Sequence, residues 1–514
     1  MAATIGKNAI FGVVASVVQI ATRFIMIPVV LHYLGLGGYG IWSIIMVTAA
    51  YMRFGSAGIK SAFQKYVAEA TATGDYETAN KLLSTGSISI LILSSAALIP
   101  AVLFSQQLAR MAGVPAEFVV SAAASIAVLA VTYTIANFGA AFEAIVMGGQ
   151  RIDLTRKVNT VLSICEAVVI IALLHAGFGL LAMTFVMGAS ELIYILACYW
   201  MSHRVVPQMH ISVTYFTKAA FRELIRFAGS YQLVNVLEMV YGSVVPIVIL
   251  RFFGADAVGI ASLAQRLVAA AIIAQDALII PILSGASVVF ASGSKETLRL
   301  FLGKSFKVTL AAALPPLAFV SAFGAAMIYA WTGQADPKLS LAVSLIALAA
   351  LLNALSLLQL VLYRASGRAM LDNIRQVLRI IAILIVAFFA RSLGFQGVLA
   401  GMAAAQMVGV VFMFVVMAKT FHAFSAKILT EDTLRIVAGT ALVIGAGALA
   451  GMIPIQLHEP ERMIAFVKLA KIGIGCLIMA WPALLITKVV SRSERRAILD
   501  SLIPGRRKLA QASQ

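Results

Sequence analysis

Apolar segments of about 20 residues follow one another along nearly the whole chain and are separated by short polar gaps. A helix needs about 20 mostly apolar residues to cross the ~30 Å hydrocarbon core of a bilayer. The pattern therefore predicts an all-α polytopic membrane protein with about 14 transmembrane helices. The expected spans are 9–33, 38–57, 83–104, 119–147, 158–175, 180–201, 228–252, 257–283, 305–330, 340–363, 376–391, 397–418, 435–452 and 465–488.

The distribution of basic residues predicts the orientation of these spans. Of the 514 residues, 61% are hydrophobic and 12% are charged, and the net charge is +18. With the N-terminus placed inside, the inner segments hold 30 of the 39 Lys and Arg, and the outer gaps hold 7. Basic residues accumulate in cytoplasmic loops, so both termini are expected in the cytoplasm. The same rule explains the positive charge without a nucleic-acid partner.

An internal repeat divides the chain. The segment YLGLGGYGIWS at 33–43 matches FFGADAVGIAS at 252–262 with a shift of 219, and 147–157 resembles 365–375 with a shift of 218. Two matches far apart in the sequence thus give nearly the same shift. The repeat predicts two six-helix pseudo-repeats around a central cavity, plus two C-terminal helices, with the halves related by an axis along the membrane normal. The expected domains are 1–210, 211–425, 426–490 and a basic cytoplasmic tail, 491–514.

Two arginines stand inside the apolar segments, and the other basic residues lie at segment edges. Arg23 lies near the middle of the first segment and Arg266 lies inside the eighth, while Arg53 is a third candidate at the end of the second. An Arg at bilayer depth costs at least ~2.5–3.5 kcal/mol unless it faces protein or water. A guanidinium binds phosphate oxygens bidentately. These arginines therefore predict a cavity for an anionic, phosphate-bearing substrate.

Further polar residues at membrane depth extend the candidate site. Gln19, Asn235 and Gln265 lie on polar faces of the first, seventh and eighth spans and are candidate substrate-binding residues. The acidic candidates for ion coupling are Glu238, Asp276 and Glu166.

Two interpretations stay open for these groups. The arginines either line the cavity or pair with buried carboxylates that lock helices together. Glu238 and Asp276 either carry protons or sodium ions or serve as counter-ions of the arginines. Two other acidic residues, Glu143 and Glu191, are expected to be interfacial or structural.

No motif indicates an enzyme or a cofactor. The sequence has no P-loop, no HExxH, no GxSxG and no His cluster with metal-ligand spacing. We therefore expect no catalytic residues, no metal and no cofactor.

The opening GKNAIFGVV…RFIMIPVVLHYLGLGGYGIW resembles the first two helices of Wzx-type polysaccharide flippases. So does the following FGSAGIKSAFQKYVAEATATGDYETANKLL, and FFGADAVGIASLAQRL resembles the start of their second half. These flippases belong to the multidrug/oligosaccharidyl-lipid/polysaccharide exporter superfamily. Related lipid II flippases carry cavity arginines on the first, second and eighth helices, where this chain has Arg23, Arg53 and Arg266.

The resemblance implies a lipid-linked oligosaccharide flippase of the bacterial cytoplasmic membrane. Its partners would be a polyprenyl-pyrophosphate-linked oligosaccharide, the lipid bilayer, a proton or sodium ion, and glycan polymerase and chain-length proteins. It would supply surface polysaccharide synthesis, such as lipopolysaccharide or exopolysaccharide, by alternating access. Two alternatives are a multidrug or organic-cation antiporter of the same superfamily and a non-transporting membrane scaffold. The first span has no Asp or Glu, which counts against the antiporter.

Overall fold

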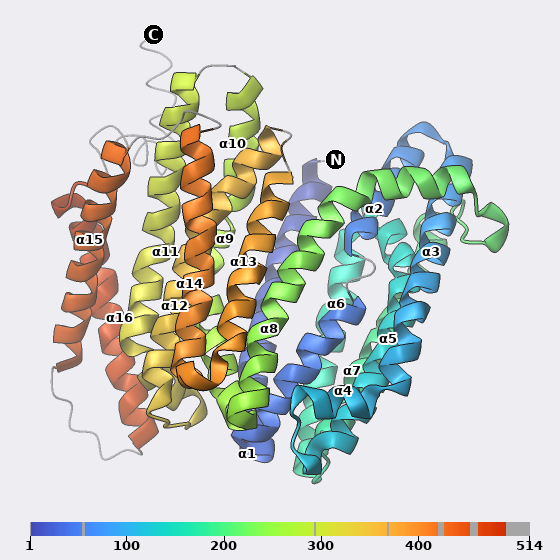
Figure 1. Cartoon of the computed structure of the whole chain (residues 1–514). Helices are drawn as coiled ribbons and strands as arrows, with labels where there is room; N and C mark the ends of the chain where they lie inside the picture. The colour runs from blue at the N-terminus through green and yellow to red at the C-terminus, as the bar shows by residue number, and fades with distance from the viewer. Residues whose placement is uncertain are drawn as a thin grey trace. The chain divides into compact units, whose positions relative to one another are not determined.

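The structure is a computed structural model that describes residues 2–53, 57–291, 295–366, 368, 370–419, 426–452 and 461–489. Helices make up nearly all of this part of the chain (Figure 1). They are α1 (Ala2–Arg53), α2 (Ala57–Thr73), α3 (Tyr76–Leu103), α4 (Ser105–Ala112), α5 (Ala116–Gly148), α6 (Ile152–His175), α7 (Leu180–Val205), the 3₁₀ turn η2 (Val213–Tyr215), α8 (Lys218–Ala271), α9 (Ile273–Asp276), α10 (Ile279–Ala291), α11 (Lys295–Thr332), α12 (Lys338–Ala365), α13 (Met370–Phe388), α14 (Ala390–Lys419), α15 (Ala426–Met452) and α16 (Glu461–Ile486).

The prediction of an all-α polytopic membrane protein is confirmed. Within the described residues, 11 helices are long and apolar enough to cross a membrane. Two of them, α1 and α8, each cover one expected span and most of the next, so the exact number of 14 crossings stays a prediction.

Two expected spans differ in detail. The span 257–283 is interrupted, because α8 ends at Ala271 and the short α9 and α10 follow. The span expected from 376 begins earlier, since α13 starts at Met370. This shift of six residues brings Arg375 into the helix beside Arg379, which lies near the start of the expected span and in the middle of α13.

The helices divide into two compact units. Unit 1 comprises Met1–Ser262 with Ala369–Gly401, and unit 2 comprises Leu263–Arg368 with Met402–Gln514. In unit 1, α5 packs against α2, α3 and α7, and α6 packs against α1. Fully buried Phe63, Val67 and Leu83 form part of its core with Ala141 and Ile145. In unit 2, α11 packs against α12, α15 and α16.

The first sequence match of the repeat has a structural counterpart inside unit 1. α1 bends at Gly35, and α8 bends at Gly254, where both glycines adopt a left-handed φ with an extended ψ (68° and 179°; 85° and 178°). Only glycine adopts this backbone without strain, which explains why it occupies both positions.

The two bends also pack directly on each other. A Cβ added to Gly40 would overlap the carbonyl oxygen of Ala255, and a Cβ added to Gly259 would lie 2.5 Å from the carbonyl oxygen of Leu36. Gly40 and Gly259 are repeat partners, and so are Leu36 and Ala255. The contact is therefore pseudo-twofold symmetric, and it requires glycine, which has no side chain, at the equivalent position of both repeats.

Candidate functional site

Arg23 and Arg266 lie at matching positions relative to the two bends. Arg23 precedes Gly35 by twelve residues, and Arg266 follows Gly254 by twelve. At a helical rise of 1.5 Å per residue, the Cα atom of each arginine lies about 18 Å along its helix from the bend. If the bends mark one membrane surface, both arginines sit near the middle of a core about 30 Å thick.

Both arginines are exposed, and among the described residues neither forms an ion pair. Arg23 belongs to unit 1 and Arg266 to unit 2. The two interpretations, a cavity role and pairing with buried carboxylates, therefore both stay predictions. An exposed cation inside an apolar span needs protein, water or an anionic ligand as its partner.

The remaining expected binding residues are described unevenly. Gln19 donates from Nε2 to Oδ1 of Asn159 at 2.7 Å, which ties α1 to α6. Gln265 is half-buried beside Arg266 on α8. The side chains of Arg53 and Asn235 lie outside the described residues.

The three acidic candidates have different surroundings. Asp276 is exposed at the end of α9, in unit 2, and Glu166 is half-buried on α6, in unit 1. Glu238 accepts hydrogen bonds from α13: its Oε2 bonds to Nη1 of Arg379 at 3.1 Å and to Nε2 of Gln376. Glu238 is therefore a counter-ion, although its partner is Arg379 and neither of the arginines expected from the sequence.

Arg379 sits at the centre of α13 and is completely buried. Its guanidinium lies over the Tyr241 ring at 4.1 Å, and its Nη1 also donates to Oε1 of Gln376 at 2.7 Å. One turn earlier, Nε of Arg375 donates to Asp372 at 2.8 Å, and both side chains are buried. α13 thus carries a buried ionic stripe.

Sequence reasoning missed this stripe because the charge count grouped the arginines between 364 and 379 with an inner segment, although the expected span began at 376. The spacing of the four residues was a usable signal: 372, 375, 376 and 379 lie at i, i+3, i+4 and i+7. That spacing places them on one helical face, and charged residues on one face of an otherwise apolar helix indicate burial against protein.

The contact of Gln19 with α6 and the contact of Glu238 with α13 occupy equivalent positions in the internal repeat. Gln19 shifted by 219 is Glu238, and α6, shifted by 218, begins where α13 begins, at 370. In each half, the first helix is therefore joined to the fifth by a side-chain hydrogen bond at the same level. The first-half contact is neutral, whereas the second-half contact is ionic.

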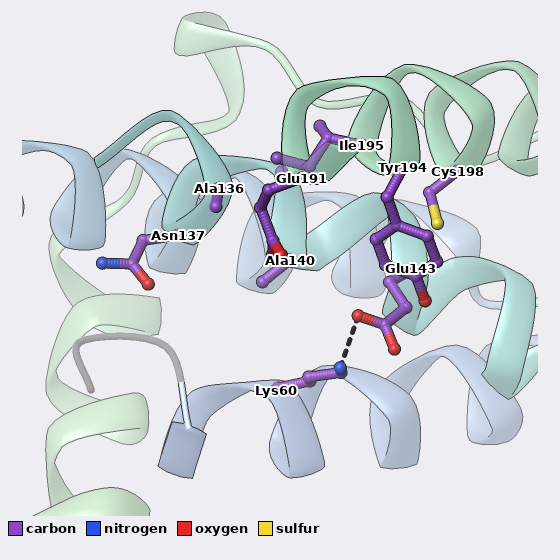
Figure 2. A pocket seen from close by; sticks show the side chains of 10 residues that line it. Lys60, Ala136, Asn137, Ala140, Glu143, Glu191, Tyr194, Ile195 and Cys198 are labelled. Carbon is purple, nitrogen blue, oxygen red and sulfur yellow. Dashed lines mark ion pairs between the residues drawn. The ribbon is translucent and has the colours of Figure 1, made fainter. Parts of the chain in front are cut away.

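A cavity of unit 1 brings further charged residues together (Figure 2). It encloses about 410 Å³ of unfilled space, open mouth included, between α2, α5 and α7. Lys60 of α2 forms an ion pair with Glu143 of α5 inside it. Tyr194 and Cys198 of α7 interact with Glu143 from the other side, and Glu191 also lines the cavity.

The Lys60–Glu143 pair contributes little to holding α2 in place. Partly exposed ion pairs contribute about 0–1 kcal/mol, whereas burying a Phe or Val side chain contributes about 1.5–3 kcal/mol. α2 buries both Phe63 and Val67 completely against α5. The pair therefore neutralises charge in the cavity, and apolar packing fixes the helix.

Comparison with known proteins identifies relatives at the level of family and fold. Residues 5–288 match the model of a family described as polysaccharide biosynthesis protein. Comparison with curated protein sequences finds no match.

Solved structures share the architecture. The lipid II flippase MurJ in an inward closed conformation aligns with a TM-score of 0.70 and 14% identity, covering 92% of this chain and 99% of that one. An inward-facing multidrug resistance MATE family transporter of the MOP superfamily aligns with a TM-score of 0.64 and 18% identity, covering 79% and 98%. A MOP superfamily transporter from Pyrococcus furiosus aligns at 0.59 and 17% identity, covering 82% and 96%. At these identities the similarity shows the fold alone.

Proposed function

Because this chain belongs to the polysaccharide biosynthesis protein family, we propose that it flips a polyprenyl-pyrophosphate-linked oligosaccharide. The substrate moves from the inner to the outer leaflet of the bacterial cytoplasmic membrane, for surface polysaccharide synthesis. Both termini lie in the cytoplasm, as the distribution of basic residues predicts. The observation that carries the proposal is the pair of exposed arginines, Arg23 and Arg266, which form no ion pair with any described residue and lie twelve residues from Gly35 and from Gly254.

In this proposal the two arginines bind the pyrophosphate. Each guanidinium can make bidentate hydrogen bonds with phosphate oxygens, and such charge-assisted bonds are roughly twice as strong as neutral ones. Arg53 is the third candidate ligand, and Gln19, Gln265 and Asn235 supply hydrogen bonds to the glycan. The glycan occupies the cavity between the halves, the prenyl chain stays in lipid, and the halves alternate between inward and outward access.

The carboxylates divide into two groups in this mechanism. Glu238 is held by Arg379 and Gln376, so it compensates a fixed charge and is a poor carrier of a proton or sodium ion. Coupling to an ion gradient then falls to Asp276 or Glu166, or to the membrane potential acting on the bound substrate. One charge that crosses the potential is worth ~2.3 kcal/mol per 100 mV, which is enough to bias the cycle.

The antiporter alternative predicts a different polarity of the cavity. An organic-cation carrier needs unpaired carboxylates at membrane depth, whereas the first span, which carries Arg23, has no Asp or Glu. The scaffold alternative predicts that neither arginine matters for polysaccharide export.

The test is rescue of a flippase-deficient strain by single variants. We expect Arg23→Ala and Arg266→Ala to abolish rescue while membrane expression stays normal. Lys substitutions should rescue weakly, because an ammonium cannot bind phosphate bidentately. Arg110→Ala is the matched control, because Arg110 is also exposed but lies on the short α4. Full rescue by both alanine variants would overturn the proposal, and drug resistance conferred by the wild type would favour the antiporter.

A further inference from the structure

The segment that joins the two sequence halves, residues 206–217, is fixed to the start of α3. Asn80, Ser84 and Thr85 of α3 are buried and lie on one helical face. Within the described residues, the hydrogen bonds of these three side chains go to main-chain groups of the segment. Nδ2 of Asn80 donates to the carbonyl of Gln208 at 3.1 Å, and its Oδ1 accepts from the amide of His210 at 3.0 Å.

The same pattern continues along the segment. Oγ of Ser84 accepts from the amide of Ser212 at 3.1 Å and donates to the carbonyl of His210 at 3.4 Å. Oγ1 of Thr85 accepts from the amide of Thr217 at 3.0 Å and donates to the carbonyl of Tyr215 at 3.4 Å. Three side chains therefore satisfy the segment's main chain as a neighbouring β-strand would, and this fixes the direction of its side chains.

Some apolar side chains of this fixed segment point into the core, and others point away from it. Val206 and Met209 are buried in the core of unit 1. Val213 is 77% exposed and Phe216 is 44% exposed, and Phe221, in the first turn of α8, is exposed as well. A fixed segment that presents large apolar side chains outside the spanning helices indicates a contact with another apolar phase.

Along the chain from 192 to 222 the charges have one sign, because this stretch contains no Asp or Glu and lies between Glu191 and Glu223. Its Arg204, Lys218 and Arg222 are exposed. The guanidinium of Arg204 stacks on the exposed Trp200 ring at 3.6 Å. Trp next to basic residues at the end of a spanning helix is typical of the membrane–water interface, where rings sit at the headgroup level.

The start of α8 has the matching geometry. In Figure 1, its first turns run at a steep angle to α3 and α5 before the helix bends into its long span. A helix that lies across the ends of the spanning helices is oriented like an interfacial helix, with apolar residues toward the acyl chains and basic residues toward the headgroups.

We propose that Val213, Phe216 and Phe221, with Arg204, Lys218 and Arg222, form a membrane-surface anchor that binds anionic lipid headgroups. The apolar side chains insert at the boundary between headgroups and acyl chains, and the basic side chains bind lipid phosphates. The anchor rests on the membrane-spanning fold and is independent of the substrate proposed above. It holds the connection between the two halves at the membrane surface, so its occupancy depends on the anionic lipid content of that leaflet.

The test places an environment-sensitive fluorophore on single cysteines of the full-length protein in nanodiscs. The background carries Cys165→Ser, because Cys165 is exposed whereas Cys198 and Cys476 are buried. Val213→Cys and Phe216→Cys are the test positions. Thr73→Cys is the matched control, since Thr73 is exposed and lies three residues before α3, at the same end of the unit as the anchor.

In nanodiscs that contain phosphatidylglycerol, we expect blue-shifted emission from both test positions. Brominated lipid should quench them and aqueous iodide should not, while Thr73→Cys should show the reverse. In phosphatidylcholine alone the blue shift should shrink, and replacing Arg204, Lys218 and Arg222 by Gln should remove the difference between the two membranes. Iodide quenching equal to that of the control would overturn the proposal. Protection from both quenchers would also overturn it, because it would mean that protein covers the segment.

Discussion

Replacing Glu238 and replacing Arg379 should lower the free energy of unfolding by different amounts, because the two side chains differ in exposure. Arg379 is completely buried, whereas 49% of the Glu238 side chain is accessible. Glu238→Gln leaves a buried cation without its counter-ion, and breaking a buried pair in this way costs about 3–5 kcal/mol. Arg379 keeps Gln376 and the Tyr241 ring, and a cation–π contact contributes about 0.5–2 kcal/mol, so we expect a loss of about 2–3 kcal/mol.

The reverse substitution should be milder. Arg379→Met removes the buried charge and leaves a half-accessible carboxylate that Gln376 still binds. Water reaching Glu238 compensates its charge, so we expect a loss of about 1 kcal/mol, near the net value of one hydrogen bond. The double variant Glu238→Gln/Arg379→Met should lose less than the two single variants together, because it buries no uncompensated charge.

Equilibrium unfolding in mixed detergent micelles, with folding checked by size-exclusion chromatography, measures the three differences in free energy. We expect Glu238→Gln to lose more stability than Arg379→Met, and the double variant to lose less than the sum of the two single variants. Equal losses for the two single variants, or strict additivity, would refute the assignment of a buried cation held by a half-accessible carboxylate. The neutral contact of the first half offers a control: Gln19→Leu breaks a hydrogen bond without leaving a charge behind.

Two further predictions concern the backbone contacts. Gly40→Ala should destabilise the protein by about 1–3 kcal/mol, because the added methyl group overlaps the Ala255 carbonyl. Gly242→Ala is the control and should be neutral or stabilising, because its methyl group meets open space on α8. Thermal unfolding midpoints compare the two variants, and equal midpoints would contradict the packing of the bends. Asn80→Ala should expose the amide of His210 and speed its hydrogen exchange. Ala79→Ser, one position away on α3, tests whether any substitution there has this effect. Unchanged hydrogen exchange at 208–217 in Asn80→Ala would contradict the fixed segment.

The periodic signals of the sequence predicted the fold well. Spans are defined by composition over 20 residues, and such averages survive errors of several residues at each end. The repeat also placed Gly35 opposite Gly254, and the structure gives both the same unusual backbone. A glycine in a left-handed conformation is a local requirement, so the sequence can report it without knowledge of the tertiary structure.

The partners of the polar residues could not be predicted in the same way. The sequence indicates that Glu238 is a carboxylate at membrane depth, but its partner lies 141 residues away on α13. Arg379 was counted with an inner segment because a charge count treats every arginine near a segment edge alike. The structure places Arg379 in the middle of α13, where its side chain is completely buried. The hydrogen bonds that fix 206–217 were not anticipated either, since Ser, Thr and Asn on α3 read equally well as ordinary small polar residues.

The fixed segment also has a consequence for biosynthesis. Every donor and acceptor that holds it, from Asn80 to Thr217, lies in the first 217 residues. Chains fold from the N-terminus as the ribosome releases them. The segment can therefore dock on α3 as soon as it has left the ribosome, before the whole of α8 has been released, so that α8 starts from a fixed point when it enters the membrane. A nascent chain stalled far enough beyond residue 217 for the segment to clear the ribosome should already contain this starting point.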